Sequence, residues 1–284
     1  MNDACIEVQD VELAYRRGPR ILRLDEAIVG NGEVVSVVGP NGGGKTTLLR
    51  CIAGLMPPRR GSVRLDGRDI YGRGALSRRE RARAAAVVLT DVVAPAYLHV
   101  DEIVSLGRLP HLSPVRRSNA VEAREVREAM AATGVSHLAG RFVGEVSDGE
   151  RQRVMIARAL AQRPRVLLLD EPAAHLDPPH QTGLFLLLRD LVARGAIRSA
   201  VLATHHLHLA MHFSDSLLVV YRGGAQSGTS EELTRTGAIE RAFGADAPAM
   251  GLSPQTHTPS GRPTPRDDLR FDPQRGWFIP RSIG

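Results

Sequence analysis

The sequence predicts an α/β fold with a parallel core sheet, an antiparallel β flank and a helical subdomain. Two short, mainly apolar runs predict core strands, because strands of a parallel sheet are covered on both faces. The first run, 33–38, leads through a glycine-rich loop into a helical pattern over 47–53. The second, 166–169, ends in Asp170 and Glu171. The 284 residues, 43% of them hydrophobic, suffice for one large domain with a lobe or tail.

Hydrophobic patterning assigns the elements in chain order. The antiparallel flank is expected from strands near 6–8, 12–15, 21–24 and 62–65. The parallel core strands are centred on 35–38, 87–89, 166–169 and 201–203. The helical subdomain covers about 92–144 and includes a helix over 119–132. A returning strand over 216–221 and short helices over 230–243 complete a predicted domain of residues 1–243.

The C-terminal part of the chain changes in composition. Residues 244–268 are rich in Pro, Ser, Thr and Gly, which predicts a linker that buries no core. Residues 269–284 regain apolar and aromatic character, and we expect a small β extension, a hairpin anchored by Trp277. The sequence thus predicts three parts: a cassette-sized domain, a linker and a C-terminal extension.

Composition limits the compartment and the partners. No apolar stretch approaches the roughly 20 residues that a spanning helix needs, so we expect a cytoplasmic protein without a leader peptide. Cys5 and Cys51 are too few for a disulfide framework and are expected to be buried thiols. The net charge is +6, from 37 basic and 31 acidic residues. Because the arginines are scattered, we interpret them as a solvated surface and expect no nucleic-acid partner.

Lys45 is the only lysine in the chain, and the other 36 of the 37 lysine and arginine residues are arginines. A position that keeps lysine requires a compact ammonium and excludes a broad guanidinium. Residues 39–46 fit the P-loop pattern between a strand and a helix, where backbone N–H groups and the helix N-terminus bind phosphate. The alternative is a chance glycine-rich turn. The residues expected to bind a nucleotide here are Gly39, Pro40, Asn41, Gly42, Gly43, Gly44, Lys45, Thr46 and Thr47, with the Thr46 hydroxyl on Mg²⁺.

Asp170 and Glu171 end an apolar strand at the sheet edge where ligands of parallel sheets bind. We expect Asp170 to hold Mg²⁺, directly or through water, and Glu171 to polarise the water that attacks the γ-phosphate. The alternative is a strand that ends in a charged turn. Upstream, Ser147 and Glu150 form an S-x-x-E capping box, and the same capped helix start can also bind an anion.

These motifs, with the Leu176-Asp177 turn and in this order, resemble the ATP-binding cassette (ABC) ATPases over about residues 4–243. The resemblance implies a P-loop NTPase fold, ATP hydrolysis and a head-to-tail homodimer that encloses two ATP molecules. It assigns adenine stacking to Tyr15 and contact with the partner's γ-phosphate to Ser147 and Gly149. It places Asp177 at the dimer seam and gives His205 the γ-phosphate contact. The catalytic set is therefore Glu171, His205 and Lys45.

Two positions depart from the family pattern. Asp148 stands where the signature motif has its first glycine, and its carboxylate can favour the dipole at the helix start. Thr90 stands where the family has a glutamine that approaches Mg²⁺ and senses the membrane partner. We expect Thr90 to belong to the nucleotide site, although its hydroxyl extends less far toward Mg²⁺ than a glutamine side chain.

Residues 99–111 resemble a stretch found in the ATPases of importers of iron–siderophore, haem and cobalamin. This resemblance implies a separate transmembrane permease as partner, a substrate-binding protein acting indirectly, and a peripheral location on the inner face of the cell membrane. A plain amphipathic helix with an arginine cap explains the same pattern without naming a cargo. The alternatives are an importer of another cargo, a non-transport ABC ATPase acting on nucleic acid, and a regulatory subunit that only binds ATP.

Four histidines follow the strand at 200–203, and His208 and His212 have i, i+4 spacing. Zinc or iron binding is one interpretation of this spacing. No cysteine or glutamate nearby completes a ligand set, so we interpret His208 and His212 as surface positions of a helix.

Overall fold

The computed structural model describes residues 4–15, 18–89, 95–112, 120–244, 269–272 and 277–280, the last two ranges by their backbone. Its central sheet has six strands in the order β10-β9-β3-β8-β7-β6. The five strands from β9 to β6 run parallel, and β10 pairs antiparallel with β9 at one edge. Their bounds are β3 Val34–Val38, β6 Ala85–Val88, β7 Val166–Asp170, β8 Ser199–Thr204, β9 Ser216–Tyr221 and β10 Gly224–Gly228. The predicted parallel core is confirmed.

The flank is a separate antiparallel sheet in the order β2-β1-β4-β5. Its strands are β1 Ala4–Ala14, β2 Arg20–Gly30, β4 Arg60–Leu65 and β5 Arg68–Asp69. The prediction of separate strands near 6–8 and 12–15 is wrong, since both belong to β1. A register shift between Gln9 and Glu12 in the pairing of β1 with β4, with Asp10 at a φ of 48°, marks a bulge inside one continuous strand. Tyr15 lies just beyond the end of β1.

Two layers cover the central sheet, and β7 shows how its side chains divide between them. Val166 and Leu168 pack with the flank sheet and with α1 (Lys45–Ile52). Leu167 and Leu169 point the other way and pack with α5 (Asp148–Ala161) and α6 (Pro178–Ala193). A strand that is buried on both faces explains the uninterrupted apolar run in the sequence.

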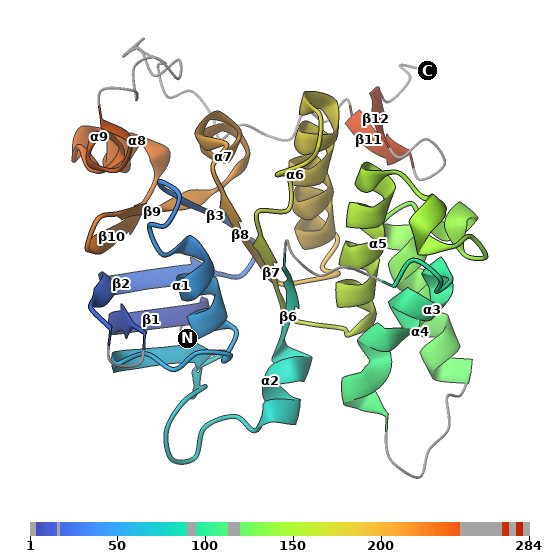
Figure 1. Cartoon of the computed structure of the whole chain (residues 1–284), viewed down its shortest axis with the longest axis horizontal. Helices are drawn as coiled ribbons and strands as arrows, with labels where there is room; N and C mark the ends of the chain where they lie inside the picture. The colour runs from blue at the N-terminus through green and yellow to red at the C-terminus, as the bar shows by residue number, and fades with distance from the viewer. Residues whose placement is uncertain are drawn as a thin grey trace.

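The helical subdomain lies beside the sheet and is joined to it by α5 (Figure 1). It contains α3 (Val100–Ser105), the 3₁₀ segment η1 (Leu106–His111) and α4 (Ala120–Ala132). Two further 3₁₀ turns, η2 (Ser136–Leu138) and η3 (Val143–Glu145), lead to α5. The remaining helices are α2 (Arg78–Ala84), α7 (Leu207–Phe213), α8 (Ser230–Arg235) and α9 (Ala238–Phe243).

Near the C-terminus, β11 (Leu269–Asp272) and β12 (Trp277–Pro280) pair antiparallel as the expected hairpin, and β12 lies beside α6 (Figure 1). The side chain of Trp277 and residues 245–268 lie outside what the structure describes. Among the residues that it does describe, no helix is long and apolar enough to cross a lipid bilayer. Both cysteines are buried thiols, as predicted, and Sγ of Cys5 donates to Oδ1 of Asn31 at 2.8 Å.

Candidate nucleotide-binding site

The P-loop, residues 39–46, connects β3 to α1 and is held closely between two other strands. Gly39 has a φ of 154°, and a Cβ at this position would lie 2.2 Å from the carbonyl oxygen of Val220 at the end of β9. Gly44 has a φ of 106°, and its Cβ would lie 2.9 Å from side-chain carbons of Ile21 and Leu22 on β2. Both positions therefore require glycine for backbone conformation and for space.

Lys45 is buried at the first position of α1 and is 6% exposed. Its Nζ donates to the carbonyl oxygens of Gly39, at 2.9 Å, and Pro40, at 3.3 Å. The same ammonium lies 3.3 Å from Oε1 of Glu171. A guanidinium carries its nitrogens in a broad plane and does not fit between a loop and a carboxylate this close. The structure therefore agrees with the argument drawn from the single lysine.

Thr46 and Asp170 meet where α1 begins and β7 ends. The Thr46 hydroxyl donates to Oδ1 of Asp170 at 2.9 Å. Asp170 is 6% exposed. Burial raises the pKa of Asp170, and the nearby Glu171 carboxylate raises it further, while the Thr46 hydrogen bond acts in the opposite direction. Because the Thr46 hydroxyl donates its hydrogen bond to the carboxylate, the lone pairs of its oxygen can still bind a cation.

Glu171 follows β7 with a left-handed backbone conformation, at a φ of 46°. A non-glycine residue rarely adopts this conformation, which costs about 1–3 kcal/mol and clusters at functional sites. Its N–H donates to the carbonyl of Ala203 on β8 at 3.0 Å, which fixes the turn. Its Oε2 lies 2.7 Å from Nδ1 of His205. The structure thus brings Lys45, Glu171 and His205 together at the carboxyl ends of β7 and β8.

Lys45 and Glu171 border a hollow of about 550 Å³, which we call the nucleotide hollow. Tyr15 is 60% exposed at its rim, and its hydroxyl lies 3.5 Å from Oγ1 of Thr47. A size of 300–1,000 Å³ is usual for small-molecule sites. The sequence motifs do not identify two of the lining residues, Arg20 and Ile21. The pairing of β1 with β2, which brings Arg20 opposite Ala14, is the signal that could have found them. The lining consists of Tyr15, Arg20, Ile21, residues 41–47 and Glu171.

Comparison with known proteins identifies the family that shares this site. Residues 25–174 match the family described as ABC transporter. Over 258 residues the chain is 38% identical to the hemin import ATP-binding protein HmuV of Pseudomonas aeruginosa, covering 88% of this chain and 96% of that one. The chain belongs to the ABC transporter family.

Other ABC relatives share most of the chain. The cobalamin import ATP-binding protein BtuD of Halobacterium salinarum is 42% identical over 257 residues, which are 90% of this chain but only 62% of the length of that relative. The structure of cbiO1 from Clostridium perfringens, part of the ABC transporter complex cbiONQ, superposes with a TM-score of 0.72 at 26% identity. That match covers 88% of this chain and 98% of the other.

The ABC signature segment lies at the start of α5, and its residues do not line the nucleotide hollow. Ser147 caps α5, because its Oγ accepts from the backbone N–H of Glu150 at 3.3 Å. Its own N–H and hydroxyl donate to Oε2 of Glu150, at 2.9 and 2.8 Å. The predicted capping box is confirmed. Asp148 is exposed and pairs with Arg151 at 2.8 Å. Its carboxylate is thus partly neutralised by its own helix, which reduces the conflict of an acidic residue in an ABC signature.

The ABC turn residue Asp177 caps α6 by accepting from the backbone N–H of His180 at 3.1 Å. The imidazole of His180 also bonds this carboxylate and lies over the signature glycine. A Cβ on Gly149 would meet Cδ2 of His180 at 2.9 Å. The starts of α5 and α6 are therefore packed together, so Ser147, Gly149 and Asp177 belong to one surface. Thr90, the remaining predicted site residue, lies outside the described residues.

The segment 99–111, which resembles importer ATPases, packs against the C-terminal end of α5. Arg108 is 6% exposed, and its NH1 donates to the carbonyl of Ala161 at 2.6 Å. A ring nitrogen of His111 lies 2.7 Å from the carbonyl of Gln162. A Cβ on Gly107 would lie 2.0 Å from the carbonyl oxygen of Arg158. These residues satisfy the last carbonyls of α5, so the arginine-cap interpretation explains the pattern structurally.

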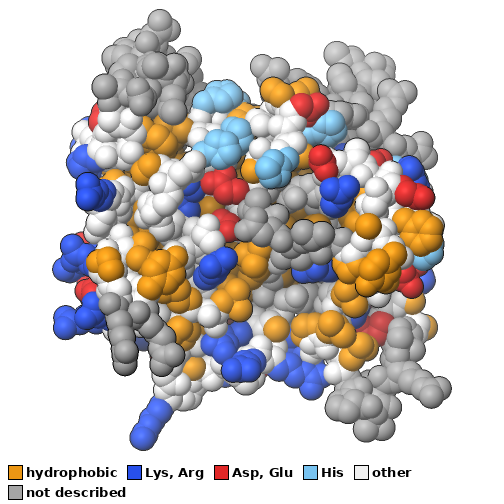
Figure 2. Space-filling model, in the orientation of Figure 1, with side chains coloured by type: hydrophobic (Ala, Val, Ile, Leu, Met, Phe, Trp, Pro, Cys, Tyr) orange, Lys and Arg blue, Asp and Glu red, His pale blue; other side chains and the backbone are white. Residues whose placement is uncertain are grey.

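Histidine side chains lie close to acidic side chains on the face shown in Figure 2. Within the part of the chain that the structure describes, no group of three or more His, Cys, Asp or Glu is placed to hold a metal ion. His208 and His212 are exposed on α7, in agreement with the surface interpretation.

Proposed function

We propose that this chain is the ATP-hydrolysing subunit of an importer that takes up an iron complex or cobalamin through a separate membrane permease. The site supports the ATPase part, and the relatives support the cargo class. Those relatives are named as import ATP-binding proteins for cobalamin, hemin, iron(3+)-hydroxamate and ferric enterobactin. Residues 99–111 give less support to the cargo class, because the packing of Arg108 and His111 against α5 explains their sequence pattern.

The observation that carries the proposal is the convergence of Lys45, Glu171 and His205 beside the P-loop. In the proposed reaction the P-loop backbone and Lys45 bind the β- and γ-phosphates. Glu171 orients a water whose oxygen attacks the γ-phosphorus, and the water proton passes to the Glu171 carboxylate. The bond to the β-phosphate oxygen breaks, which releases ADP and phosphate. His205, held at 2.7 Å by Glu171, contacts the γ-phosphate.

The residues at the end of β7 fit Mg²⁺. Hard cations prefer carboxylate and hydroxyl oxygens, and Thr46 and Asp170 provide one of each at 2.9 Å from one another. Burial raises the pKa of Asp170 in the ligand-free chain, and a bound cation would lower it by stabilising the carboxylate. Bound there, Mg²⁺ would neutralise charge on the phosphate oxygens. Thr46 and Asp170 would hold it, with Thr90 as a further neighbour.

The proposed dimer is supported by predicted site residues that do not line the nucleotide hollow. Ser147, Gly149 and Asp177 share one surface away from the hollow, which supports a head-to-tail homodimer in which they complete the site of the other subunit. Tyr15, exposed at the rim, is free to stack on adenine. We place the dimer in the cytoplasm, peripheral on the inner face of the membrane, where it contacts the permease and acts with a substrate-binding protein indirectly.

Transport in vesicles tests the proposal. The chain is reconstituted with its permease, with ATP enclosed on the side of the ATPase, and uptake of haem, a ferric siderophore and cobalamin is measured. We expect ATP-dependent uptake of one of the three and none with Glu171→Gln. ATP hydrolysis without uptake of any of them would contradict the cargo class, and absence of Mg²⁺-dependent ATPase activity would contradict the whole proposal.

A further inference from the structure

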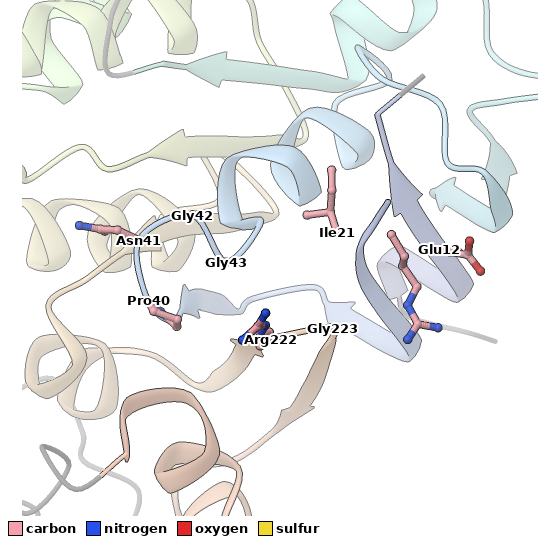
Figure 3. Close-up of a pocket in the computed structure, with 9 residues that line it drawn as sticks. Glu12, Ile21, Pro40, Asn41, Gly42, Gly43, Arg222 and Gly223 are labelled. Atoms are coloured by element: carbon pink, nitrogen blue, oxygen red, sulfur yellow. The ribbon is translucent and has the colours of Figure 1, made fainter. Parts of the chain in front are cut away.

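A second hollow, of about 660 Å³, lies on the outer side of the P-loop. We call it the outer hollow. P-loop residues 40–43 form one wall, and the β9–β10 turn with Arg222 and Gly223 forms another. Glu12 of β1 and Arg20 and Ile21 of β2 close it (Figure 3). Three segments that are distant in sequence therefore meet around one cavity.

The charge of the outer hollow is dominated by two guanidinium groups. Within the described residues, neither the Arg20 side chain nor the Arg222 side chain makes a hydrogen bond or an ion pair, and both residues are exposed. Two arginines of the flank sheet are paired, by contrast: Arg64 with Asp69 at 3.1 Å and Arg68 with Glu80 at 2.9 Å.

The acidic residue of the outer hollow does not neutralise these two groups. Glu12 lies 3.7 Å from the guanidinium of Arg59, which does not line the cavity. The carboxylate of Glu12 therefore has a counter-charge of its own. The guanidiniums of Arg20 and Arg222 leave the outer hollow with an excess of positive charge at neutral pH.

The two hollows are adjacent. Arg20, Ile21 and residues 41–43 line both of them. Arg222 lines the outer hollow and not the nucleotide hollow. A nucleotide bound over Tyr15 and the P-loop would therefore lie beside the outer hollow.

We propose that the outer hollow is a second phosphate-binding site, formed by Arg20 and Arg222. It takes a phosphate group carried on the ribose of the bound nucleotide, or a free phosphate ion. Guanidinium forks match phosphate oxygens in pairs, and a phosphate has enough acceptor oxygens for both arginines. The ribose-linked form rests on the proposed nucleotide binding at Lys45, whereas the free-ion form does not.

Binding of ADP and of ADP with a 3′-phosphate tests the ribose-linked form, because the chain hydrolyses neither. Both are titrated calorimetrically with Mg²⁺ into wild type, Arg222→Ala, Arg222→Lys and the control Arg73→Ala. Arg73 is exposed and lines neither hollow. We expect wild type and Arg73→Ala to bind the 3′-phosphorylated form about tenfold more tightly than ADP, since two charge-assisted contacts are added. Arg222→Ala loses this preference, and Arg222→Lys keeps part of it.

Inorganic phosphate titrated into wild type saturated with ADP tests the free-ion form. Binding that disappears in Arg222→Ala supports it. The proposal is overturned if the two nucleotides bind wild type equally and phosphate binds no better to wild type than to Arg222→Ala. If ADP itself does not bind wild type, the proposed nucleotide site fails, and phosphate titrated alone still decides whether the outer hollow binds it.

Discussion

The buried ammonium of Lys45 and the half-buried carboxylate of Glu171 form an ion pair, with Nζ 3.3 Å from Oε1, between the first residue of α1 and the residue after β7. The ammonium also bonds the carbonyls of Gly39 and Pro40. A triphosphate in the P-loop would attract the same ammonium. Nucleotide binding would therefore free Glu171 from its cation and leave it held by His205, which connects binding to the formation of the catalytic arrangement.

Lys45→Arg should weaken ATP binding even though the charge is kept. The guanidinium does not fit between the loop carbonyls and Glu171, so we expect a loss of at least about tenfold, or about 1.4 kcal/mol. Lys45→Ala should lose more. Affinity is measured by titration with a fluorescent ATP analogue, and circular dichroism confirms folding. Equal affinity of wild type and Lys45→Arg would show that the site does not select the ammonium.

Arg108→Ala should destabilise the fold. Arg108 is buried, pairs with the half-buried carboxylate of Glu122 and bonds the carbonyl of Ala161, so its removal takes a charged partner from both groups. We expect a loss of about 3 kcal/mol in the free energy of unfolding, measured with urea. Arg124→Ala is the matched control, because the Arg124–Glu128 pair is exposed and is worth about 0.5 kcal/mol or less. Similar losses in both variants would contradict a structural role for residues 99–111.

Asp170→Asn should separate stability from function. Burial raises the pKa of Asp170, so its charged form disfavours the folded, ligand-free chain above that pKa. Asp170→Asn should therefore be more stable than wild type at pH 7. This difference should shrink as pH falls through the raised pKa, where wild-type Asp170 takes up a proton. Mg²⁺-dependent ATP binding should be weakened at pH 7. If the stability difference between Asp170→Asn and wild type grows as pH falls, the pKa of Asp170 is not raised in the folded chain.

Ser147 should act on the nucleotide of the other subunit. Ser147→Arg and Lys45→Ala are each expected to prevent ATP-dependent dimerisation, whereas a mixture contains heterodimers with one intact composite site. Sedimentation with ATP should show dimers in the mixture and not in either variant alone. If no mixing ratio restores dimers, the head-to-tail arrangement is not supported.

The sequence was most informative where a motif is local. The P-loop and the Asp170-Glu171 end of β7 were predicted because a strand, a loop and a helix signal lie side by side in the chain. The role of Arg108 depends on the end of α5, and the left-handed backbone of Glu171 depends on the carbonyl of Ala203. A pattern of neighbouring residues in the sequence cannot predict such contacts, because the partners are distant along the chain. The bulge at Asp10 misled strand prediction for the same reason, since only pairing with neighbouring strands keeps β1 continuous.

The turnover of Glu171→Gln tests the central claim most directly. Steady-state ATP hydrolysis and ATP affinity are measured for wild type and Glu171→Gln, with His208→Ala, an exposed α7 variant, as control. We predict that Glu171→Gln binds ATP with near wild-type affinity and loses about 10²- to 10⁴-fold in turnover, because the positioned base is gone. His208→Ala should hydrolyse ATP normally. Hydrolysis by Glu171→Gln at a rate close to wild type would contradict the assignment of Glu171 as the group that activates water.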